Sequence, residues 1–297
     1  MKLVLGTVQF GLCYGINNQK GKPSRESSLK MLKRAYDLGI NIFDTANAYG
    51  DAESILGEFV EKYDLKNKIK IISKLKPNII DDTKEVKDVI IKQLKNSLNL
   101  LQLDKLDGYL LHTPSYIYND DIIKALDYCK NEGLTENIGV SIYDMEDAIY
   151  AAKTKKIDYI QIPYSVFDQR VNKTDFFKIA RDNNVVVYGR SAFLQGLFFM
   201  PNNKIPPHLK DAKIYLSQFD EIIYKYRLSR LEATLLFSYC NPFIDYLVFG
   251  VDDIYQLQQD VDIALSNTDI SDCVTELKGK MSVMQRSIIF PSLWTKQ

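Results

Sequence analysis

Short apolar runs that alternate with amphipathic stretches constrain the fold of this 297-residue chain more than any other feature. The runs are continuous rather than alternating in polarity, which is typical of strands that are covered on both faces. A strand followed by a helix, repeated along the chain, predicts a parallel sheet joined by right-handed crossovers. The eight predicted strands are Leu3–Gly6, Ile40–Asp44, Ile69–Lys74, Leu106–His112, Asn137–Ser141, Tyr159–Pro163, Asn184–Tyr188 and Tyr246–Gly250.

The stretches between these runs have the three- and four-residue apolar spacing of helices that pack one face on a core. In Thr83–Leu101, for example, Val86, Ile90 and Leu94 share one face, and lysines occupy positions between them. The predicted helices are Ser27–Leu38, Ala52–Lys62, Thr83–Leu101, Asp121–Asn131, Met145–Ala152, Phe176–Asn183 and Ile254–Ser266.

Eight strand–helix units in about 300 residues predict an α/β fold, a single (β/α)8 barrel of the TIM type. A doubly wound sheet is the alternative, but the turn after the first strand, Gly6–Gly11, lacks the GxGxxG spacing that usually opens it. We also predict a long loop at Ser191–Pro207, an extra helix at Thr275–Gln285 and a tail at Ile288–Gln297. No linker divides the chain, so residues 1–297 are predicted to form one domain.

The composition argues against several classes of protein. Lysine plus arginine and aspartate plus glutamate each number 38, whereas a nucleic-acid surface usually shows a basic excess. The four cysteines have neither CxxC nor Cys/His spacing, which predicts free thiols, a reducing compartment and no metal site. No apolar stretch reaches ~20 residues, so we predict a cytoplasmic protein that does not enter a membrane.

Polar side chains end several of the predicted strands. Asp44, Lys74 and His112 end the second, third and fourth strands, Ser141 ends the fifth, and Gln161 lies in the sixth. In a (β/α)8 barrel all strands point the same way, and catalytic groups gather at their C-terminal ends. These side chains, together with Tyr49 in the loop after the second strand, are therefore predicted to meet at one mouth of the barrel.

The set suits the protonation of an oxygen that becomes an alkoxide. A tyrosine, with a reference pKa near 10, becomes a useful acid when a nearby ammonium stabilises its anion. A carboxylate can hold that ammonium, and a histidine can orient a carbonyl. No side chain supplies a hydride, so carbonyl reduction implies a nicotinamide cofactor. Taken singly, each residue has a simpler interpretation: Asp44 as a helix cap, Lys74 as a solvated strand end, and His112 as a core-edge residue.

Motifs along nearly the whole chain resemble those of the aldo-keto reductase family. They are LGTVQFG at 5–11, FDTANAYG at 43–50, SKL at 73–75, LLHTP at 110–114, GVS at 139–141, QIPYSVFD at 161–168, SAFLQGLF at 191–198 and FGVDDIYQL at 249–257. The resemblance implies that Tyr49 is the general acid, that Lys74 lowers its pKa, that Asp44 pairs with Lys74, and that His112 orients the carbonyl. The opening and the SAFLQGLF motif resemble a bacterial subset linked with sugar or surface-polysaccharide metabolism.

The resemblance also implies cofactor contacts and two departures from them. Ser141 and Gln161 match residues that hold the nicotinamide carboxamide, but Ile142 stands where the family has asparagine. Arg190 stands where relatives commonly stack an aromatic ring; we favour a cofactor-side role for it, with an anionic substrate or the pyrophosphate as alternatives. The other cofactor-binding residues that we predict are Gly6, Thr7, Ser191, Leu194, Gln195, Leu197, Gly250, Asp252, Gln256 and Asp260.

Asp252 is the most informative residue for the choice between NADPH and NADH. NADPH-preferring relatives place a lysine or arginine near the start of the last barrel helix, where this chain has Asp252 and Asp253. An acid beside the ribose suits a 2′-hydroxyl and repels a phosphate. The simpler interpretation is that both aspartates cap the helix that begins near Ile254. We expect weak or reversed NADP selectivity.

The predicted substrate is a small-molecule carbonyl, a sugar or a small aldehyde, held by aromatic walls. The residues predicted to bind it are Phe10, Tyr14, Tyr116 and Trp294. The alternative function is a nucleotide-binding regulatory protein on the same fold with little turnover. The chain starts at the first barrel strand, without the hairpin that relatives place before it, and both a monomer and a homo-oligomer are compatible with the sequence.

Overall fold

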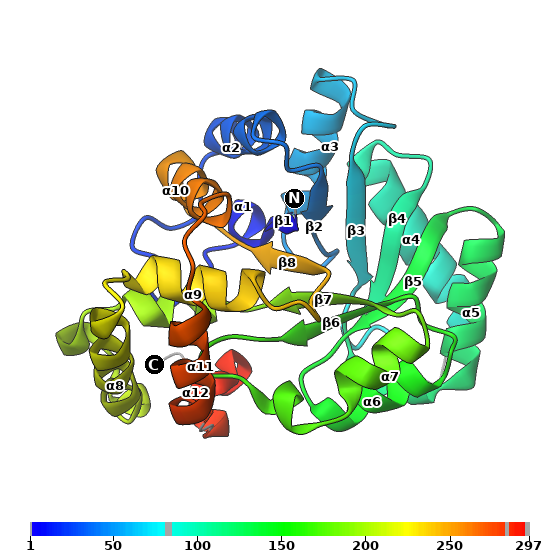
Figure 1. The fold of residues 1–297 in the computed structure, drawn as a ribbon. Coiled ribbons are helices and arrows are strands. Elements are labelled where there is room, and N and C mark those ends of the chain that lie inside the picture. Colours follow the sequence, from blue (N-terminus) through cyan, green and yellow to red (C-terminus); the bar gives the residue numbers. More distant parts are fainter. Residues whose placement is uncertain (1, 81–84, 283–284, 295–297) are drawn as a thin grey trace.

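Eight parallel strands close into a barrel in the computed structural model, which describes residues 2–80, 85–282 and 285–294 (Figure 1). Each strand pairs with its neighbours in chain order, and β1 pairs with β8 to complete the ring. The predicted (β/α)8 barrel is therefore confirmed. The strands are β1 (Leu3–Gly6), β2 (Ile42–Asp44), β3 (Lys70–Leu75), β4 (Leu106–Leu111), β5 (Thr135–Ser141), β6 (Tyr159–Pro163), β7 (Val186–Arg190) and β8 (Tyr246–Phe249).

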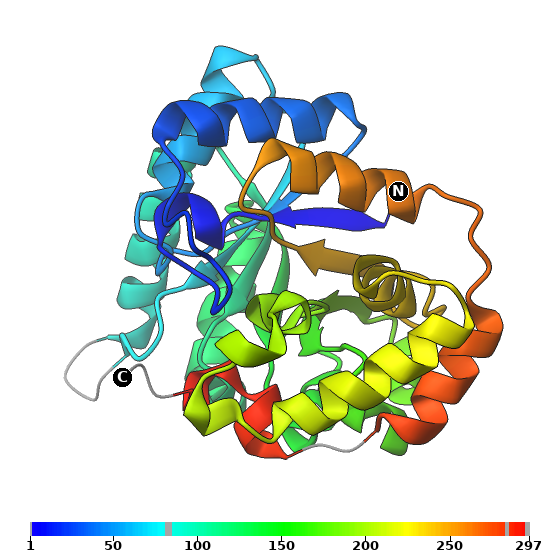
Figure 2. The same ribbon diagram turned by 90° about the vertical axis from the view of Figure 1, so that its left-hand side faces the viewer.

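The helices form an outer layer around this ring, and Figure 2 shows α2 and α10 side by side over β1. None of the described helices is long and apolar enough to cross a membrane. The helices are α1 (Val8–Gly11), α2 (Arg25–Asp37), α3 (Ala52–Lys62), α4 (Val86–Leu101), α5 (Asp120–Asn131), α6 (Met145–Lys153), α7 (Phe176–Asp182), α8 (Ala212–Lys225), α9 (Arg230–Tyr239), α10 (Ile254–Ala264), α11 (Ser271–Lys280) and α12 (Arg286–Ile289).

Alternation along the strands divides the core into two parts. Side chains such as Leu5, Phe43 and Ile71 point outward and pack under the helices. Their sequence neighbours point inward and form a separate cluster, because successive side chains of a strand face opposite sides. The inward cluster contains Val4, Ile42, Ile72, Leu110, Tyr159 and Tyr188, with Val186, Tyr246 and Val248 packed against it.

The residues two positions after this inward cluster also point into the barrel, and most of them are polar. We call this set the mouth layer, because it closes the interior at the C-terminal end of the strands. Glycine occurs in it at positions 6 and 250, where the backbone itself lines the interior. The mouth layer consists of Gly6, Asp44, Lys74, His112, Ser141, Gln161, Arg190 and Gly250.

The opposite end of the barrel is filled by three tyrosines, Tyr159, Tyr188 and Tyr246, which we call the tyrosine floor. Their rings pack in succession, with centroids 5.2 Å and 5.0 Å apart. The Tyr159 hydroxyl donates to Asp107 at 3.1 Å, and Asp107 pairs with Lys70 at 3.0 Å. The tyrosine rings thus fill the interior with apolar surface, and the Tyr159 hydroxyl is hydrogen-bonded to Asp107.

Several predicted boundaries are wrong. Strand β7 starts and ends two residues later than predicted and so includes Arg190. The extra C-terminal helix is α11, which begins and ends earlier than the predicted Thr275–Gln285. Part of the predicted helix at Thr83–Leu101, residues 83 and 84, lies outside the described residues, and α4 is described from Val86.

The sequence prediction missed two helices, α8 and α9, that precede β8. Helix α8 buries Ala212, Leu216 and Phe219 on one face, which is the spacing of a packed helix. Helix α9 begins with a capping box in which the Ser229 side chain accepts from the Glu232 amide and Glu232 accepts from the Ser229 amide. Both signals are present in the sequence. The predicted long loop before them contains three short 3-10 turns, at Leu194–Phe199, Asn202–Lys204 and Pro207–Leu209.

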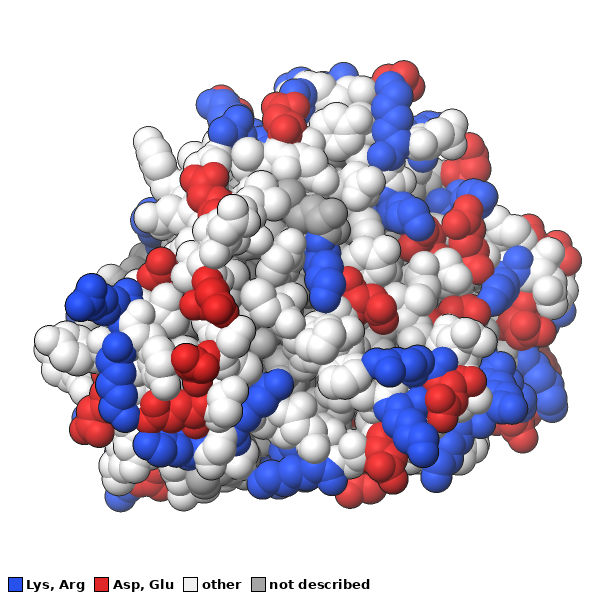
Figure 3. Space-filling view, viewed as in Figure 1, with Lys and Arg blue, Asp and Glu red and all other residues white. Residues whose placement is uncertain are grey.

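Positive and negative side chains are interspersed on the face seen in Figure 3, in keeping with the equal numbers of acidic and basic residues. No broad field of one sign covers that face.

Candidate active site

A cavity of about 380 Å³ opens at the C-terminal end of the barrel strands. Its volume lies in the range of small-molecule sites, and it occupies the end of the barrel where such sites form. Every member of the mouth layer except Lys74 lines it. The loops after β1, β2, β5 and β7 and the start of α10 complete the wall.

Lys74 lies behind this wall in a buried ion pair with Asp44. Its Nζ is 2.6 Å from Asp44 Oδ2 and donates to the Thr45 carbonyl oxygen at 2.9 Å. Burial lowers the pKa of Lys74, while the Asp44 carboxylate raises it in opposition. The other carboxylate oxygen of Asp44 accepts from Gln161 Nε2, so Asp44 orients both a cation and an amide.

Tyr49 reaches the cavity from the loop after β2. Lys74 Nζ lies 5.2 Å from the centroid of the Tyr49 ring, and the His112 ring meets it edge-on at 5.7 Å. Burial and the Asp44 charge raise the pKa of the phenol well above its usual value, and Arg190 acts in the opposite direction. Tyr49 is therefore a protonated phenol at neutral pH, with a cation beside it.

Two glycines hold the Tyr49 loop against α1. A Cβ atom at Gly11 would overlap the Tyr49 carbonyl oxygen, and one at Gly50 would overlap the Gly11 carbonyl oxygen. Gly50 also has a left-handed backbone with φ of 57°. The position of Tyr49 thus depends on backbone-to-backbone contact, which the sequence GLC at 11–13 and YG at 49–50 permits.

A buried carboxylate, Glu53, connects the Tyr49 loop to β3. It accepts from Ser73 Oγ at 2.5 Å and from Asn47 Nδ2 at 3.4 Å. Ser73 precedes Lys74, and Asn47 lies between Asp44 and Tyr49. Burial raises the pKa of Glu53, and these hydrogen bonds lower it in opposition.

His112 is the second ring at the mouth. Burial, followed by the charges of Lys74 and Arg190, lowers its pKa to about 3. It is therefore neutral across the physiological range and can act by hydrogen bonding. Its Nδ1 is buried and has no hydrogen-bond partner among the described residues.

Gln161 and Arg190 also carry polar atoms without partners. Gln161 Oε1 and Arg190 Nε are buried and lack a hydrogen bond within the described part of the chain. Such groups are rare in folded proteins, and at a cavity wall they indicate a ligand that completes them. Ile142, by contrast, is fully buried in the hydrophobic core and offers the cavity no polar group.

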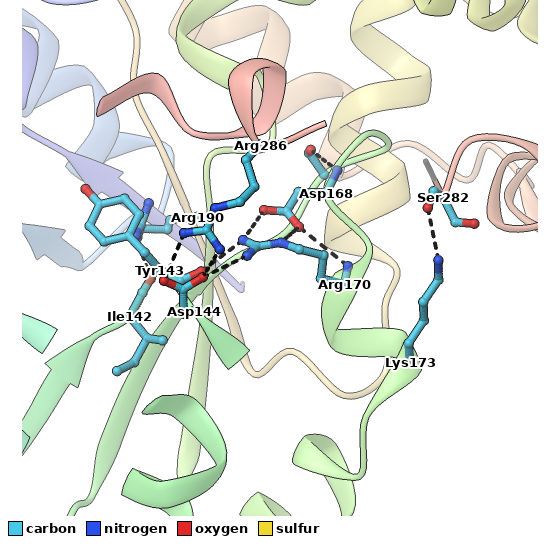
Figure 4. Close-up of polar contacts among 10 residues, drawn as sticks. Ile142, Tyr143, Asp144, Asp168, Arg170, Lys173, Arg190, Ser282 and Arg286 are labelled. Atoms are coloured by element: carbon cyan, nitrogen blue, oxygen red, sulfur yellow. Dashed lines mark hydrogen bonds and ion pairs between the residues drawn. The ribbon is translucent and has the colours of Figure 1, made fainter. Parts of the chain in front are cut away.

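Guanidinium groups and aromatic rings connect Arg190 with the C-terminal segment. Figure 4 shows Arg190, Arg170 and Arg286 around Tyr143 and Asp144. The Arg190 guanidinium lies 4.5 Å from the centroid of the Tyr143 ring, which stacks on Phe290 at 6.3 Å. Arg286 lies 4.2 Å from the Phe290 centroid and pairs with Asp144 at 2.8 Å. Helix α12 is thereby attached to the loop after β5.

The loop after β7 has an unusual backbone. Ser191, Leu194 and Gln195 have φ values of 67°, 44° and 54°, and non-glycine residues adopt this left-handed region rarely. The turn directs Leu194 and Leu197 into the core, where both are buried, while Ser191 and Gln195 line the cavity. Strained backbone of this kind is typical of functional sites.

The far end of the cavity is acidic. Asp252, Gln256 and Asp260 line it. Burial raises the pKa of Asp260 to about 8, so this carboxyl is largely protonated at neutral pH. Asp252 accepts from Asn18 Nδ2 at 3.3 Å, and burial raises its pKa as well. Asp253 caps α10 by accepting from the amides of residues 255 and 256, as the simpler interpretation of this aspartate had it.

Comparison with known proteins identifies the chain. The profile described as "Aldo/keto reductase family" matches residues 2–275. The chain belongs to the aldo/keto reductase family. It is 25% identical to the uncharacterized oxidoreductase YqkF of Bacillus subtilis over 85% of each protein. It is 27% identical to the NADH-specific methylglyoxal reductase of Escherichia coli over 66% of this chain and 64% of that protein.

The fold is that of solved family members. The holo form of the aldo-keto reductase AKR11C1 from Bacillus halodurans superposes with a TM-score of 0.77 at 22% identity, over 96% of this chain and 94% of that one. The predicted family and the predicted class of enzyme, an NAD(P)-dependent aldo-keto reductase, are confirmed. Relatives include both an NADP(+)-named and an NADH-specific member, so the family alone does not decide the cofactor.

Most site residues expected of an aldo/keto reductase line the cavity; Lys74 lies behind its wall, and five others lie elsewhere. Phe10 is fully buried in the core beneath the first loop, and Leu194 and Leu197 are buried likewise. Tyr116 accepts from the Ile80 amide at 3.1 Å, and Trp294 donates to the Ser287 carbonyl at 2.9 Å. These side chains are engaged with their own surroundings, outside the cavity lining.

Several lining residues of this aldo/keto reductase were not predicted. Gln9 lies within the quoted LGTVQFG motif, and its buried Oε1 has no partner among the described residues. Tyr143 follows the noted Ile142, and Gln259 is one helical turn from Gln256 on the same face of α10. Phe193 and Gly196 lie within the SAFLQGLF motif, whereas Asn17, Asn18 and Leu231 carry no comparable signal in the sequence.

Proposed function

We propose that this chain, acting as one domain of residues 1–297, reduces an aldehyde or ketone to an alcohol with Tyr49 as the general acid. The observation that carries the proposal is the convergence of a protonated phenol, a buried Lys–Asp pair and a neutral imidazole at one cavity wall. In this proposal the Tyr49 phenol donates its proton to the oxygen that becomes negatively charged.

Lys74 and Asp44 make that donation favourable. Proton donation would leave a phenolate on Tyr49, and the fixed ammonium of Lys74 lies 5.2 Å from the centroid of that ring. Preorganised charge in a dry site stabilises developing charge more strongly than water does. Asp44 keeps the ammonium charged and in place despite its burial.

His112 orients the carbonyl in this proposal. A neutral imidazole can donate one hydrogen bond to the carbonyl oxygen without competing with Tyr49 as an acid. Its low pKa supports that division of roles. Removal of His112 is expected to affect substrate orientation together with turnover.

The residues at the cavity fit a nicotinamide dinucleotide, which supplies the hydride when bound. Gln161 Oε1, buried without a partner in the described part of the chain, and Ser141 at the end of β5 can hold a carboxamide. The left-handed residues Ser191, Leu194, Gln195 and Gly196 shape a loop backbone suited to a pyrophosphate. Gly6, Thr7 and Gly250 provide a close backbone approach, and Gln256 and Asp260 lie at the adenine end.

We further propose that NADH binds at least as well as NADPH. Asp252 lines the far end of the cavity, and among the described residues that line it Arg190 is the only lysine or arginine. Lys20, on the loop beside this end, pairs with Asp253 at 2.7 Å. The Kd values of both reduced cofactors test the proposal, and Asp252→Asn should raise NADPH affinity more than the control Asp253→Asn. A large wild-type preference for NADPH would contradict it.

The proposed substrate is a small aldehyde or a sugar carbonyl. Tyr14, Tyr143, Phe193 and Phe199 line the cavity, and aromatic faces suit the apolar face of a sugar. Relatives named as methylglyoxal reductases, including one from Salmonella typhimurium that is 32% identical over half of this chain, support a small carbonyl.

The decisive experiment is cofactor oxidation by the purified protein against a panel of small aldehydes and sugar carbonyls. Wild type is expected to oxidise NADH or NADPH with at least one of them, and Tyr49→Phe is expected to bind cofactor without turnover. Cofactor binding without reduction of any carbonyl by wild type would instead favour the regulatory, nucleotide-binding function.

The remaining expectations concern the setting of the protein. The four cysteines are free, with Cys129 and Cys273 buried and Cys13 and Cys240 exposed, which supports our proposal of a reducing, cytoplasmic compartment. We propose that it acts on small molecules rather than nucleic acid, as a monomer or a homo-oligomer. Analytical ultracentrifugation would decide the assembly.

A further inference from the structure

Arg190 is a cation that its surroundings do not neutralise. Its Nη2 donates to the Ile142 carbonyl oxygen at 2.7 Å, and its Nη1 donates to Ser191 Oγ at 3.1 Å. Both acceptors are neutral, and no carboxylate lies within 4.0 Å of the guanidinium among the described residues. The other arginines beside it, Arg170 and Arg286, each pair with an aspartate (Figure 4).

The guanidinium is also held in place. It lies 4.5 Å from the Tyr143 ring centroid, and Tyr143 also stacks on Phe290 at 6.3 Å. The Tyr143 carbonyl oxygen accepts from Arg170 Nη2 at 2.9 Å. A charge that is stacked, hydrogen-bonded and backed by a packed segment cannot swing away from an unfavourable ligand without losing these contacts.

The charge of Arg190 acts at the reacting end of the cavity. Arg190 belongs to the mouth layer with Asp44, Lys74 and His112. It contributes to the lowered pKa values of Lys74 and His112 and opposes the raised pKa of Tyr49. A ring that delivers hydride to a carbonyl held by Tyr49 and His112 must enter this same layer.

We propose that Arg190 distinguishes the redox state of the cofactor, weakening the binding of the oxidised form relative to the reduced form. This inference rests on the proposed function. The oxidised nicotinamide ring carries a positive charge and the reduced ring carries none. A fixed cation in the mouth layer therefore repels only the oxidised ring, and the repulsion is larger in a partly buried site than in water.

The consequence concerns product inhibition during carbonyl reduction. A nicotinamide cofactor would supply hydride from a neutral ring and would leave with a cationic ring, and Arg190 would lower the affinity for that cationic product. The oxidised cofactor would then compete less with the reduced form for the free enzyme. An aromatic residue at the same position would lack this discrimination, because a ring carries no net charge.

The test compares the Kd values of reduced cofactor, oxidised cofactor and ADP-ribose, measured by calorimetry without any carbonyl substrate. In wild type, oxidised cofactor should bind more weakly than reduced cofactor. In Arg190→Gln that ratio of Kd values should fall by about fivefold or more, the repulsion expected of two unit charges in contact even in bulk water. Arg190→Lys should keep most of the ratio.

Two controls separate charge from packing. ADP-ribose lacks the nicotinamide ring, so its Kd should be the same in wild type and Arg190→Gln. Arg181→Gln removes a guanidinium that stacks on Phe243 at 5.0 Å, away from the cavity, and should change none of the three values. If Arg190→Gln does not fold, Arg190→Met provides the neutral variant.

The alternatives give different results. An equal loss of affinity for all three ligands in Arg190→Gln would assign Arg190 to the pyrophosphate and overturn the proposal. Unchanged values for all three would assign it to the substrate or to packing, with the same consequence. If neither reduced nor oxidised cofactor binds wild type, the proposed function itself is refuted. Cofactor binding with an unchanged ratio refutes only the role of Arg190.

Discussion

The two ends of the barrel each carry a tyrosine and a lysine–aspartate pair, but they differ in how buried the pair is and in whether the hydrogen bonds are complete. At the floor, Lys70 pairs with Asp107, which also accepts from Tyr159. At the mouth, Lys74 pairs with Asp44, and Tyr49 faces an open cavity. The floor pair is half-exposed on its lysine side, with 53% of the Lys70 side chain accessible, whereas 2% of the Lys74 side chain is accessible.

The difference lies in which polar groups are satisfied. Asn137 Nδ2 donates to the Tyr159 oxygen at 2.8 Å and to the Asp107 carbonyl at 2.7 Å, so the floor completes its own hydrogen bonds. The mouth leaves His112 Nδ1 and Gln161 Oε1 without partners among the described residues. A site that is closed on itself contributes to stability, and one that is left incomplete is available to a ligand.

The largest expected effect is a loss of turnover that distinguishes Tyr49 at the mouth from Tyr159 at the floor. Tyr49→Phe should lower kcat by ~10²–10⁴, the range for loss of a general acid, with little change in melting temperature. Steady-state kinetics and a thermal scan measure both. Tyr159→Phe is the matched control at the floor and should keep kcat at wild-type level. Comparable turnover in Tyr49→Phe and wild type would exclude Tyr49 as the acid.

The second prediction separates the two lysines by stability. Lys74→Met leaves a buried Asp44 without its cation and should lower the free energy of unfolding by about 3–5 kcal/mol. Lys70→Met removes a half-exposed cation, and the buried Asp107 keeps its hydrogen bond from Tyr159, so the cost should be smaller, about 1–2 kcal/mol. Urea unfolding at neutral pH measures both, and equal costs would show that the mouth pair is no more buried in solution than the floor pair.

The third prediction concerns pH and the acidic end of the cavity. The raised pKa of Asp260, about 8, means that the folded protein holds a proton that the unfolded chain has lost. The raised pKa of Asp260 therefore lowers the free energy of unfolding as the pH rises from about 4 to about 8. Asp260→Asn should therefore gain about 4 kcal/mol over wild type between about pH 5 and about pH 9, since the linkage over this range amounts to about three pKa units. Asp262→Asn, an exposed change on α10, is the control and should show no such trend.

The smallest effect is expected at the floor. Tyr159→Phe removes one hydrogen bond to Asp107 and should lower the free energy of unfolding by about 1 kcal/mol. Asp107 would keep its contacts with Lys70 and Asn137. A loss several times larger, measured by urea unfolding, would mean that the floor acts as a single cooperative network.

The mouth layer could be predicted from the sequence because strand ends are marked by a change from apolar to polar residues. Asp44, Lys74, His112 and Gln161 follow inward-facing apolar residues by two positions, and that spacing is local. Leu194 and Leu197 were predicted to offer their backbone to the pyrophosphate, which stays a prediction. That their side chains face the core follows from left-handed residues in their loop. Local pattern does not reveal such a turn.

The aromatic residues also show that local sequence does not predict contacts between distant segments. Tyr116 and Trp294 are suited to a substrate wall by type, but each has a hydrogen bond elsewhere that only the folded chain determines. Tyr143, by contrast, lines the cavity and is stacked on Phe290 from a distant segment, a contact that only the folded chain determines. Helices α8 and α9 could have been predicted, since the buried face of the first and the capping box of the second are local signals.

The attachment of Arg286 and Phe290 to the loop after β5 has a consequence for synthesis. Strand β8 and the whole ring are translated before α12, so the barrel can close while Tyr143 and Asp144 still lack their partners from the C-terminal segment. Arg170 and Arg190 contact Tyr143 and Asp144 from the start, and Phe290 and Arg286 join them only when α12 and the residue after it have been made. A ribosome that stops early would release a barrel with its floor intact and its mouth unfinished.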